Sequence, residues 1–114
     1  MNDNSREAAK VLLLDDNLMT SSRVASALRT RGCEVVVSRA APNEGAFDYV
    51  LLNLGSRSLN GVELLPGLRT RFEGAQLFGF CGHLEIEIRR TAKEAGIDRL
   101  LTNESVTALQ WLDD

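Results

Sequence analysis

Five short runs rich in apolar residues, each followed by a polar or helix-like segment, constrain the fold of this chain most strongly. The clearest of them, Val11 to Leu14, is continuously apolar and does not alternate, which is typical of a strand buried on both faces. Strands that alternate with helices predict a parallel sheet with helices on both of its faces. The expected strands are residues 11–14, 34–37, 49–52, 77–80 and 99–102.

The segments between these runs predict helices, and the sequence signals are clearer for some of them than for others. A first helix is expected over residues 18–31, with Gly32 as its stop. A helix near Val62, Leu65 and Leu68 contains Pro66, which is tolerated only if the helix begins close before it. A third helix presents Ile88, Ala92 and Ala95, and a last short one covers residues 105–112.

The connection between the second and third strands is too short for an ordinary crossover. It has only ten residues, 39–48, whereas parallel crossovers usually take about a dozen residues or more and include a helix. We therefore expect the second helix to be missing or reduced to one turn. Part of one sheet face would then be thinly covered, or covered by a partner.

Length and charge exclude several classes of protein. The 114 residues fit one domain, with residues 1–9 expected as a flexible leader and residues 10–114 as the domain. The net charge of −3 is spread along the chain and predicts no nucleic-acid surface. No signal peptide and no run of about 20 apolar residues is present, so a soluble, cytoplasmic protein without membrane contact is expected. Two cysteines and one histidine without a CxxC motif predict neither a disulfide framework nor a structural zinc site.

Polar side chains follow the predicted strands at their carboxyl ends, where functional groups gather in parallel sheets. The residues at these positions are Asp15, Asp16, Asn53, Cys81 and Asn103. Adjacent carboxylates such as Asp15 and Asp16 can hold Mg²⁺ through their oxygens. The same residues can equally serve a helix N-terminus as a cap and as partners of its dipole.

Five segments in order resemble the receiver domain of bacterial response regulators. They are residues 10–17 (KVLLLDDN), 47–54 (FDYVLLNL), 60–65 (NGVELL), 81–83 (CGH) and 94–102 (EAGIDRLLT), within a match over residues 10 to 112. The resemblance implies a flavodoxin-like, CheY-like fold with strand order 2-1-3-4-5. In that family an acidic pair binds Mg²⁺ and an aspartate on the third strand accepts a phosphoryl group from a histidine kinase. A Thr or Ser on the fourth strand and a Lys after the fifth bind the phosphate.

Four positions of this machinery depart from the family pattern. Asp15 and Asp16 fill the acidic pair, but the acceptor aspartate falls on Asn53, whose amide is no carboxylate nucleophile. The hydroxyl position falls on Cys81, a weaker hydrogen-bond donor, and the lysine on Asn103. The switch aromatic falls on Leu100, and Glu104 stands where proline is usual. We therefore predict a degenerate, non-enzymatic pseudo-receiver with no cofactor beyond a weak Mg²⁺ site at Asp15 and Asp16.

Such a domain is expected to act by protein contact in two-component-type signalling, alone or as a piece of a longer protein. The resemblance points to residues 85 to 112, the last two main helices and the strand between them, as the face for a protein partner or a homodimer. Two alternatives stay open. One is a cation- or anion-responsive switch at Asp15, Asp16 and Asn53 or Ser56; the other is a small thiol-redox or flavodoxin-like enzyme using Cys81.

Several single residues can be interpreted either as functional residues or as ordinary core, turn or surface residues. Cys81 fits a core thiol as well as a redox group, and Ser56 and Ser58 fit turn residues as well as serine-kinase sites. A Cys33–Cys81 disulfide is not expected, because the family's strand order separates them by about 14 Å. His83 is interpreted as a loop residue. Arg69, Arg71, Arg89 and Arg90 are expected to be solvated or to pair with glutamates, with docking a secondary role. Trp111 is out of phase with Leu109 and Leu112, so it is expected either at the core edge or partly exposed at an interface.

Overall fold

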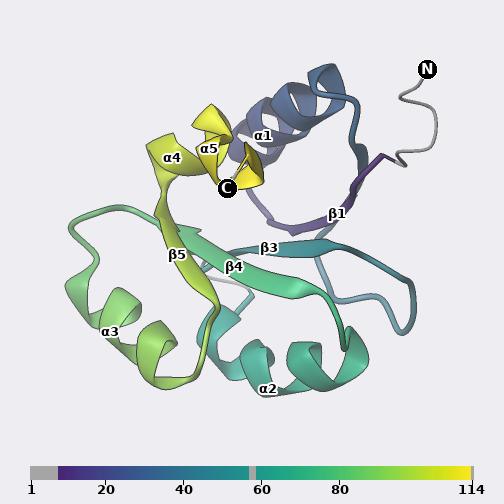
Figure 1. The fold of residues 1–114 in the computed structure, drawn as a ribbon. Coiled ribbons are helices and arrows are strands. Elements are labelled where there is room, and N and C mark those ends of the chain that lie inside the picture. The colour runs from purple at the N-terminus through teal and green to yellow at the C-terminus, as the bar shows by residue number, and fades with distance from the viewer. Residues whose placement is uncertain (1–7, 57–58, 114) are drawn as a thin grey trace.

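Five parallel strands form one sheet in the order β2-β1-β3-β4-β5 (Figure 1). The structure is a computed structural model, and it describes residues 8–56 and 59–113. The strands are β1 (Lys10–Leu14), β2 (Glu34–Ser38), β3 (Tyr49–Asn53), β4 (Gln76–Cys81) and β5 (Arg99–Thr102). The continuous apolar runs are buried as predicted: Val11 to Leu14 and Val50 and Leu51 have no exposed surface. The predicted flavodoxin-like fold and its strand order are confirmed.

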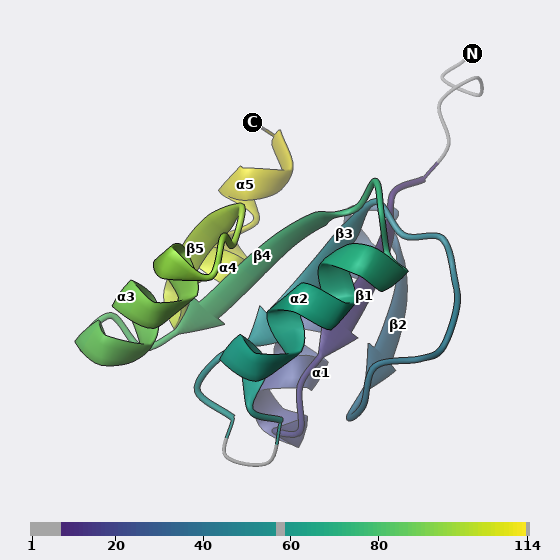
Figure 2. The ribbon, with the colours of Figure 1, turned by 90° about the horizontal axis from the view of Figure 1, so that it is seen from below.

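Helices cover both faces of the sheet (Figures 1 and 2). On one face lie α1 (Leu18–Thr30), α4 (Asn103–Ala108) and α5 (Gln110–Asp113), and on the other lie α2 (Gly61–Arg71) and α3 (Ile86–Glu94). Each face has its own apolar cluster. The first contains Val24, Leu28, Val106 and Trp111, and the second contains Leu65, Leu68 and Ala92. None of the helices in the described parts of the chain is long and apolar enough to cross a membrane.

The crossover from β2 to β3 contains no helix. Its residues, 39–48, are all described and run as an irregular loop, which confirms the expected loss of the second helix. The loop covers part of the face with Ala41 and Phe47, which pack against the second cluster, and the Phe47 ring meets Phe72 edge-on at 5.5 Å. Val36 on β2 stays 48% exposed.

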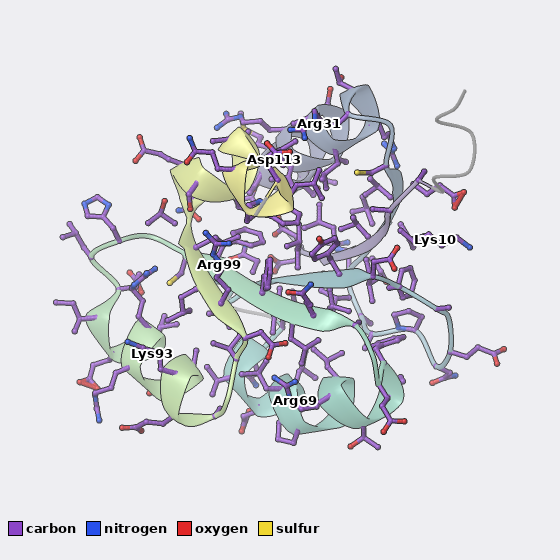
Figure 3. All side chains as sticks on the ribbon, in the orientation of Figure 1. Lys10, Arg31, Arg69, Lys93, Arg99 and Asp113 are labelled. Atoms are coloured by element: carbon purple, nitrogen blue, oxygen red, sulfur yellow. The ribbon has the colours of Figure 1, made fainter. Side chains whose placement is uncertain are left out.

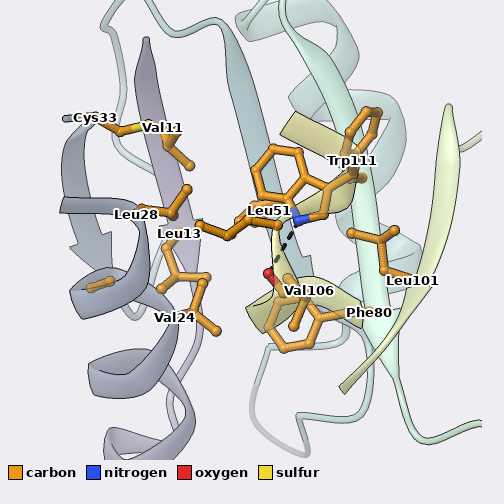
Figure 4. Close-up of a cluster of buried hydrophobic side chains, with 13 residues drawn as sticks. Val11, Leu13, Val24, Leu28, Cys33, Leu51, Phe80, Leu101, Val106 and Trp111 are labelled. Carbon is orange, nitrogen blue, oxygen red and sulfur yellow. Dashed lines mark hydrogen bonds between the residues drawn. The ribbon is translucent and has the colours of Figure 1, made fainter. Parts of the chain in front are cut away.

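The last helix is broken, and this decides between the two positions expected for Trp111, the core edge and an exposed interface. Leu109 has a φ of 63°, a left-handed conformation that ends α4, and the chain restarts as α5 at Gln110. The helical phase assumed across residues 105–112 is therefore lost, and Trp111 turns inward. It is 2% exposed, and its Nε1 donates to the Val106 carbonyl at 3.1 Å (Figure 4). Its ring meets Phe78 and Tyr49 edge-on, so it cannot serve as an exposed interface anchor.

Pro66 corrects a second expectation. The helix α2 begins at Gly61, five residues earlier, so Pro66 lies beyond the first turn and not close to the start. Proline has no N–H, so the carbonyl four residues before it, that of Val62, receives no helical bond from this position. Burial of Leu65 and Leu68 on the same helix outweighs that local loss.

Two parts of the prediction lie outside the described residues. The leader was expected over residues 1–9, of which residues 1–7 are outside them, and β1 begins at Lys10. Ser58 is outside them as well. Ser56 is half-buried, and its Oγ accepts the Leu59 N–H at 3.3 Å, as a turn residue does.

Candidate functional site

The carboxyl ends of the strands bring the predicted site residues to one edge of the sheet. Asp15 directly follows β1, Asn53 ends β3, Cys81 ends β4, and Asn103 begins α4 directly after β5. A cavity of about 830 Å³ opens at this edge, and Asn53, Cys81 and Asn103 all line it. Asp15 and Asp16 are not among the lining residues. Asp15 lies buried beneath this edge, at 2% exposure, and Asp16 is half-buried.

Asn53 and Asp15 are joined by a hydrogen bond. The Asn53 Nδ2 donates to Asp15 Oδ1 at 2.8 Å, and the same oxygen accepts the Asn17 N–H at 2.9 Å. The other end of the amide is also engaged, because Asn53 Oδ1 accepts the Gly55 N–H at 2.9 Å. A carboxylate at position 53 could only accept hydrogen bonds when ionised, and would repel Asp15 at this distance. Both ends of the Asn53 amide are therefore hydrogen-bonded, whereas a carboxylate at this position would be repelled by Asp15.

One oxygen of the site has no partner. Asp15 Oδ2 is buried and receives no hydrogen bond from the described residues. A buried unpaired acceptor favours a cation, and Asp16 supplies a second carboxylate in sequence. However, the described residues contain no group of three or more Asp, Glu, His or Cys side chains that could hold a metal. Among the described acidic side chains, Asp15 and Asp16 are therefore the predicted ligands for Mg²⁺, and the amide oxygen of Asn53 already accepts the Gly55 N–H.

The charged side chains among the described residues that line the cavity are negative. Its charged lining residues are Glu63 and Glu85, and no lysine, arginine or histidine is among the described residues that line it. Asn103, at the position of the family's lysine, contributes a neutral amide. A phosphoryl group needs cationic or oriented N–H partners to offset its charge. The electrostatics of this cavity oppose such an anion.

Cys81 presents no hydroxyl and little thiolate. It is 1% exposed, and burial raises the pKa of its thiol, an effect that the neighbouring Arg89 only partly offsets. A raised pKa keeps the thiol protonated and weakly nucleophilic near neutral pH. Cys33 is buried as well, and burial again raises its pKa. The two cysteines belong to the clusters on opposite faces of the sheet.

Arg89 has a role that the sequence interpretation missed. Its Nη1 lies 3.1 Å from the Leu101 carbonyl, to which it donates, and 3.9 Å from Cys81 Sγ. The arginine therefore ties α3 to β4 and β5. The signal in the sequence was its position directly after Ile88 and three residues before Ala92, at the border of the buried stripe of the helix. Arg90 behaves as expected: it is exposed and pairs with Glu87 and Glu94.

The other predicted positions are also located. Leu100, at the position of the switch aromatic, is half-buried on β5 opposite Gly79 and packs against the second cluster. Gly79 leaves no room for a side chain, since an added Cβ would lie 2.6 Å from Leu54 Cδ1. His83 is exposed in the loop after β4. Arg69 pairs with Asp98 at 3.2 Å, and Arg71 donates to the Pro42 carbonyl.

Comparison with solved structures identifies the fold of this chain. No protein-family model matches the sequence, and no curated protein matches it. Solved structures do match. A CheY-like receiver domain protein of Methanospirillum hungatei JF-1 superposes with a TM-score of 0.78 at 18% identity, over 94% of this chain and 92% of that one. CheY4 of Vibrio cholerae gives 0.73 at 18% identity, over 93% and 97%.

Longer regulators match over part of their length. The response regulator DrrB of Thermotoga maritima, an OmpR/PhoB homologue, gives a TM-score of 0.75 at 19% identity. The match covers 93% of this chain and 53% of DrrB, so this chain spans about half of that regulator. The three structures described are 18–19% identical to this chain, so the likeness concerns the fold. The chain has the fold of response-regulator receiver domains.

Proposed function

We propose that this chain is a non-catalytic pseudo-receiver that acts through protein contacts in bacterial two-component-type signalling, without aspartyl phosphorylation. The observation that carries the proposal is the hydrogen bond from Asn53 to Asp15, in which an amide occupies the acceptor position. Two further observations support it. No cationic side chain lies among the described lining residues of the cavity, and Cys81 and Asn103 line it at the positions where the resemblance to receivers predicts a hydroxyl and a lysine.

The test is intact-mass measurement after incubation with acetyl phosphate and Mg²⁺. The expected result is no phosphoryl adduct on the wild-type chain. An adduct would overturn the proposal, and mapping it would identify the acceptor. The variants Asn53→Asp and Asn53→Asp/Asn103→Lys calibrate the test, because they restore the nucleophile alone or together with the cation. An adduct only on the double variant would show that both losses silence the wild-type pocket.

The contact surface that we propose for a partner protein, residues 85–112, is formed by α3 and α4, which flank the edge strand β5 on opposite faces of the sheet, and by α5, which follows α4 (Figure 1). Leu84 and Ile86 at the start of this surface are 78% and 70% exposed, an unusual amount for large apolar side chains. Two basic residues belong to these elements, Lys93 on α3 and Arg99 on β5 (Figure 3). A photo-crosslinking residue at Ile86 should therefore capture a protein in the native cell, whereas one at exposed Arg23 on α1 should not. Equal capture at the two positions would refute this surface.

A second candidate function rests on the unpartnered Asp15 Oδ2, which favours a cation-responsive domain. Amide NMR during a Mg²⁺ titration tests it. Shifts confined to Asp15, Asp16 and Asn53 at millimolar Mg²⁺, and lost in Asp16→Asn, would support the candidate. An unchanged spectrum would reject it.

A further inference from the structure

The strand β2 lies at one edge of the sheet, and three of its features favour pairing with a further strand. The first is its length and regularity: all five residues from Glu34 to Ser38 pair with β1 in an unbroken register, without a bulge or a proline. Natural edge strands are usually blunted by such interruptions, by lysines or by a covering element. The crossover helix that would cover this region is missing, as described above.

The second feature is the direction of the backbone groups. Glu34 N–H donates to the Ala9 carbonyl at 2.9 Å, and Asp15 N–H donates to the Ser38 carbonyl at 3.1 Å, so Glu34 and Ser38 both face β1. Because alternate residues of a strand direct their backbone groups to opposite sides, Val35 and Val37 direct theirs away from the sheet. Arg29 Nη2 donates to the Val35 carbonyl at 3.2 Å from outside the sheet. Arg29 itself is exposed and can swing away.

The third feature is the distribution of side chains along this edge. Val36 and Val37 are 48% and 40% exposed, and they lie on opposite faces because strand side chains alternate. Exposed Glu34 begins the strand and exposed Arg39 follows its end. The edge is therefore apolar in its centre and positive at its Arg39 end, while at the other end Glu34 is paired with Lys10 of β1 at 4.0 Å.

We propose that β2 is a homodimerisation edge, and that the β2 strand of a second copy of this chain pairs with it antiparallel. In the antiparallel direction the Arg39 end of one strand lies beside the Glu34 end of the other, where Glu34 can exchange its exposed partner Lys10 for Arg39 of the second copy. With the two-fold axis at Val36, Val36 faces its own copy and Val35 faces Val37 of the second copy. The two outward-facing residues, Val35 and Val37, then form hydrogen-bonded pairs, which matches the backbone directions described above. The paired sheets become one ten-stranded sheet with the same face upward in both halves.

The interface is small, so the dimer is expected to be weak. Pairing of one five-residue strand buries less than the roughly 1,200 Å² that stable interfaces need. Sedimentation equilibrium from about 10 μM to about 1 mM spans the range in which such contacts form. We expect the average mass to rise toward that of a dimer over this range. A monomer at every concentration would overturn the proposal.

Two variants connect the association with the edge. Val36→Lys places a charge against its own copy and should abolish the rise in mass, without touching the core. Met19→Lys is the matched control, because Met19 is 75% exposed on α1, away from β2, and it should leave the rise unchanged. Association that survives Val36→Lys, or that Met19→Lys removes as well, would overturn the proposal.

Disulfide trapping tests the register. Facing residues of a non-hydrogen-bonded antiparallel pair have Cα atoms about 4.5 Å apart, within the range of about 4.4–6.8 Å that disulfides span. Val36→Cys should therefore oxidise to a dimer linked through position 36, as peptide mapping would show. Val37→Cys lies two positions out of register with its copy, more than about 7 Å away, and should oxidise much more slowly. Equal rates for the two variants would contradict the register and the edge pairing with it.

Discussion

The side-chain amide of Asn53 donates to Asp15 across 2.8 Å, and Asp15 in turn accepts the Asn17 N–H at the start of α1. The end of β3, the end of β1 and the first turn of α1 are thus held by one oxygen. The amide supplies a hydrogen-bond donor that an ionised carboxylate at position 53 would lack.

Replacing Asn53 with aspartate should destabilise the fold by about 1–3 kcal/mol near neutral pH, because a donor is lost and a like charge is added beside Asp15. Urea unfolding followed by circular dichroism measures the change. Adding Mg²⁺ should recover part of the loss in Asn53→Asp, because three carboxylate groups then share the cation. No loss of stability would mean that the hydrogen bond contributes nothing to the fold.

Arg89 and its neighbour Arg90 form a matched pair for testing the contact with β5. Arg89→Ala removes the donor to the Leu101 carbonyl and should cost about 1–2 kcal/mol of stability. Arg90→Ala breaks only exposed ion pairs and should cost less than about 0.5 kcal/mol. Equal costs in urea unfolding would refute the assigned role of Arg89.

Burial of Trp111 predicts a clear spectroscopic and energetic signature. It is the single tryptophan of the chain, so native fluorescence should be blue-shifted and resistant to iodide quenching. Trp111→Ala should cost about 3–5 kcal/mol, as large aromatic deletions in cores do. Trp111→Phe keeps most of the ring packing, loses the bond to Val106, and should cost clearly less. Efficient iodide quenching in the native state would instead show that Trp111 is exposed, the other position expected from the sequence.

The raised thiol pKa values predict an alkaline limit to stability. Burial raises the pKa of Cys33 and Cys81 in the folded state, so the fold favours the protonated thiols. This contribution is complete below the ordinary thiol pKa of about 8.5 and is lost as pH rises through the folded-state values. Urea midpoints should fall in that alkaline range, and less steeply in Cys81→Ser, whose hydroxyl does not titrate there. An identical slope in the variant would show that Cys81 does not contribute.

The strands were predictable because parallel strands buried on both faces leave a clear apolar pattern, and their order was implied by the resemblance to receiver domains. The run at Val11 to Leu14 is the clearest case, and its burial followed directly. The missing crossover helix was predictable from chain length, because a connection of only ten residues is too short for an ordinary helical crossover. The polar edge followed from both, because strand order decides which strand ends meet.

Other features depend on tertiary contacts that no local pattern records. Leu109 adopts a left-handed conformation, which is uncommon for leucine, and the turn that it makes accompanies the burial of Trp111. Pro66 sits inside a helix because the buried face of that helix outweighs a lost bond. Arg89 contacts the strands before and after its own helix, and the direction of its side chain is known only from the folded arrangement.

The alternation of backbone directions along β2 has a consequence for amide hydrogen exchange. The Glu34 amide, bonded to the Ala9 carbonyl, should be retained in deuterated solvent, and that of Val36 with it, since both face β1. The amides of Val35 and Val37, which face solvent in a single copy, should exchange within the dead time. A strand that reads slow, fast, slow, fast in dilute solution should become uniformly slow when a second copy occupies its outer side.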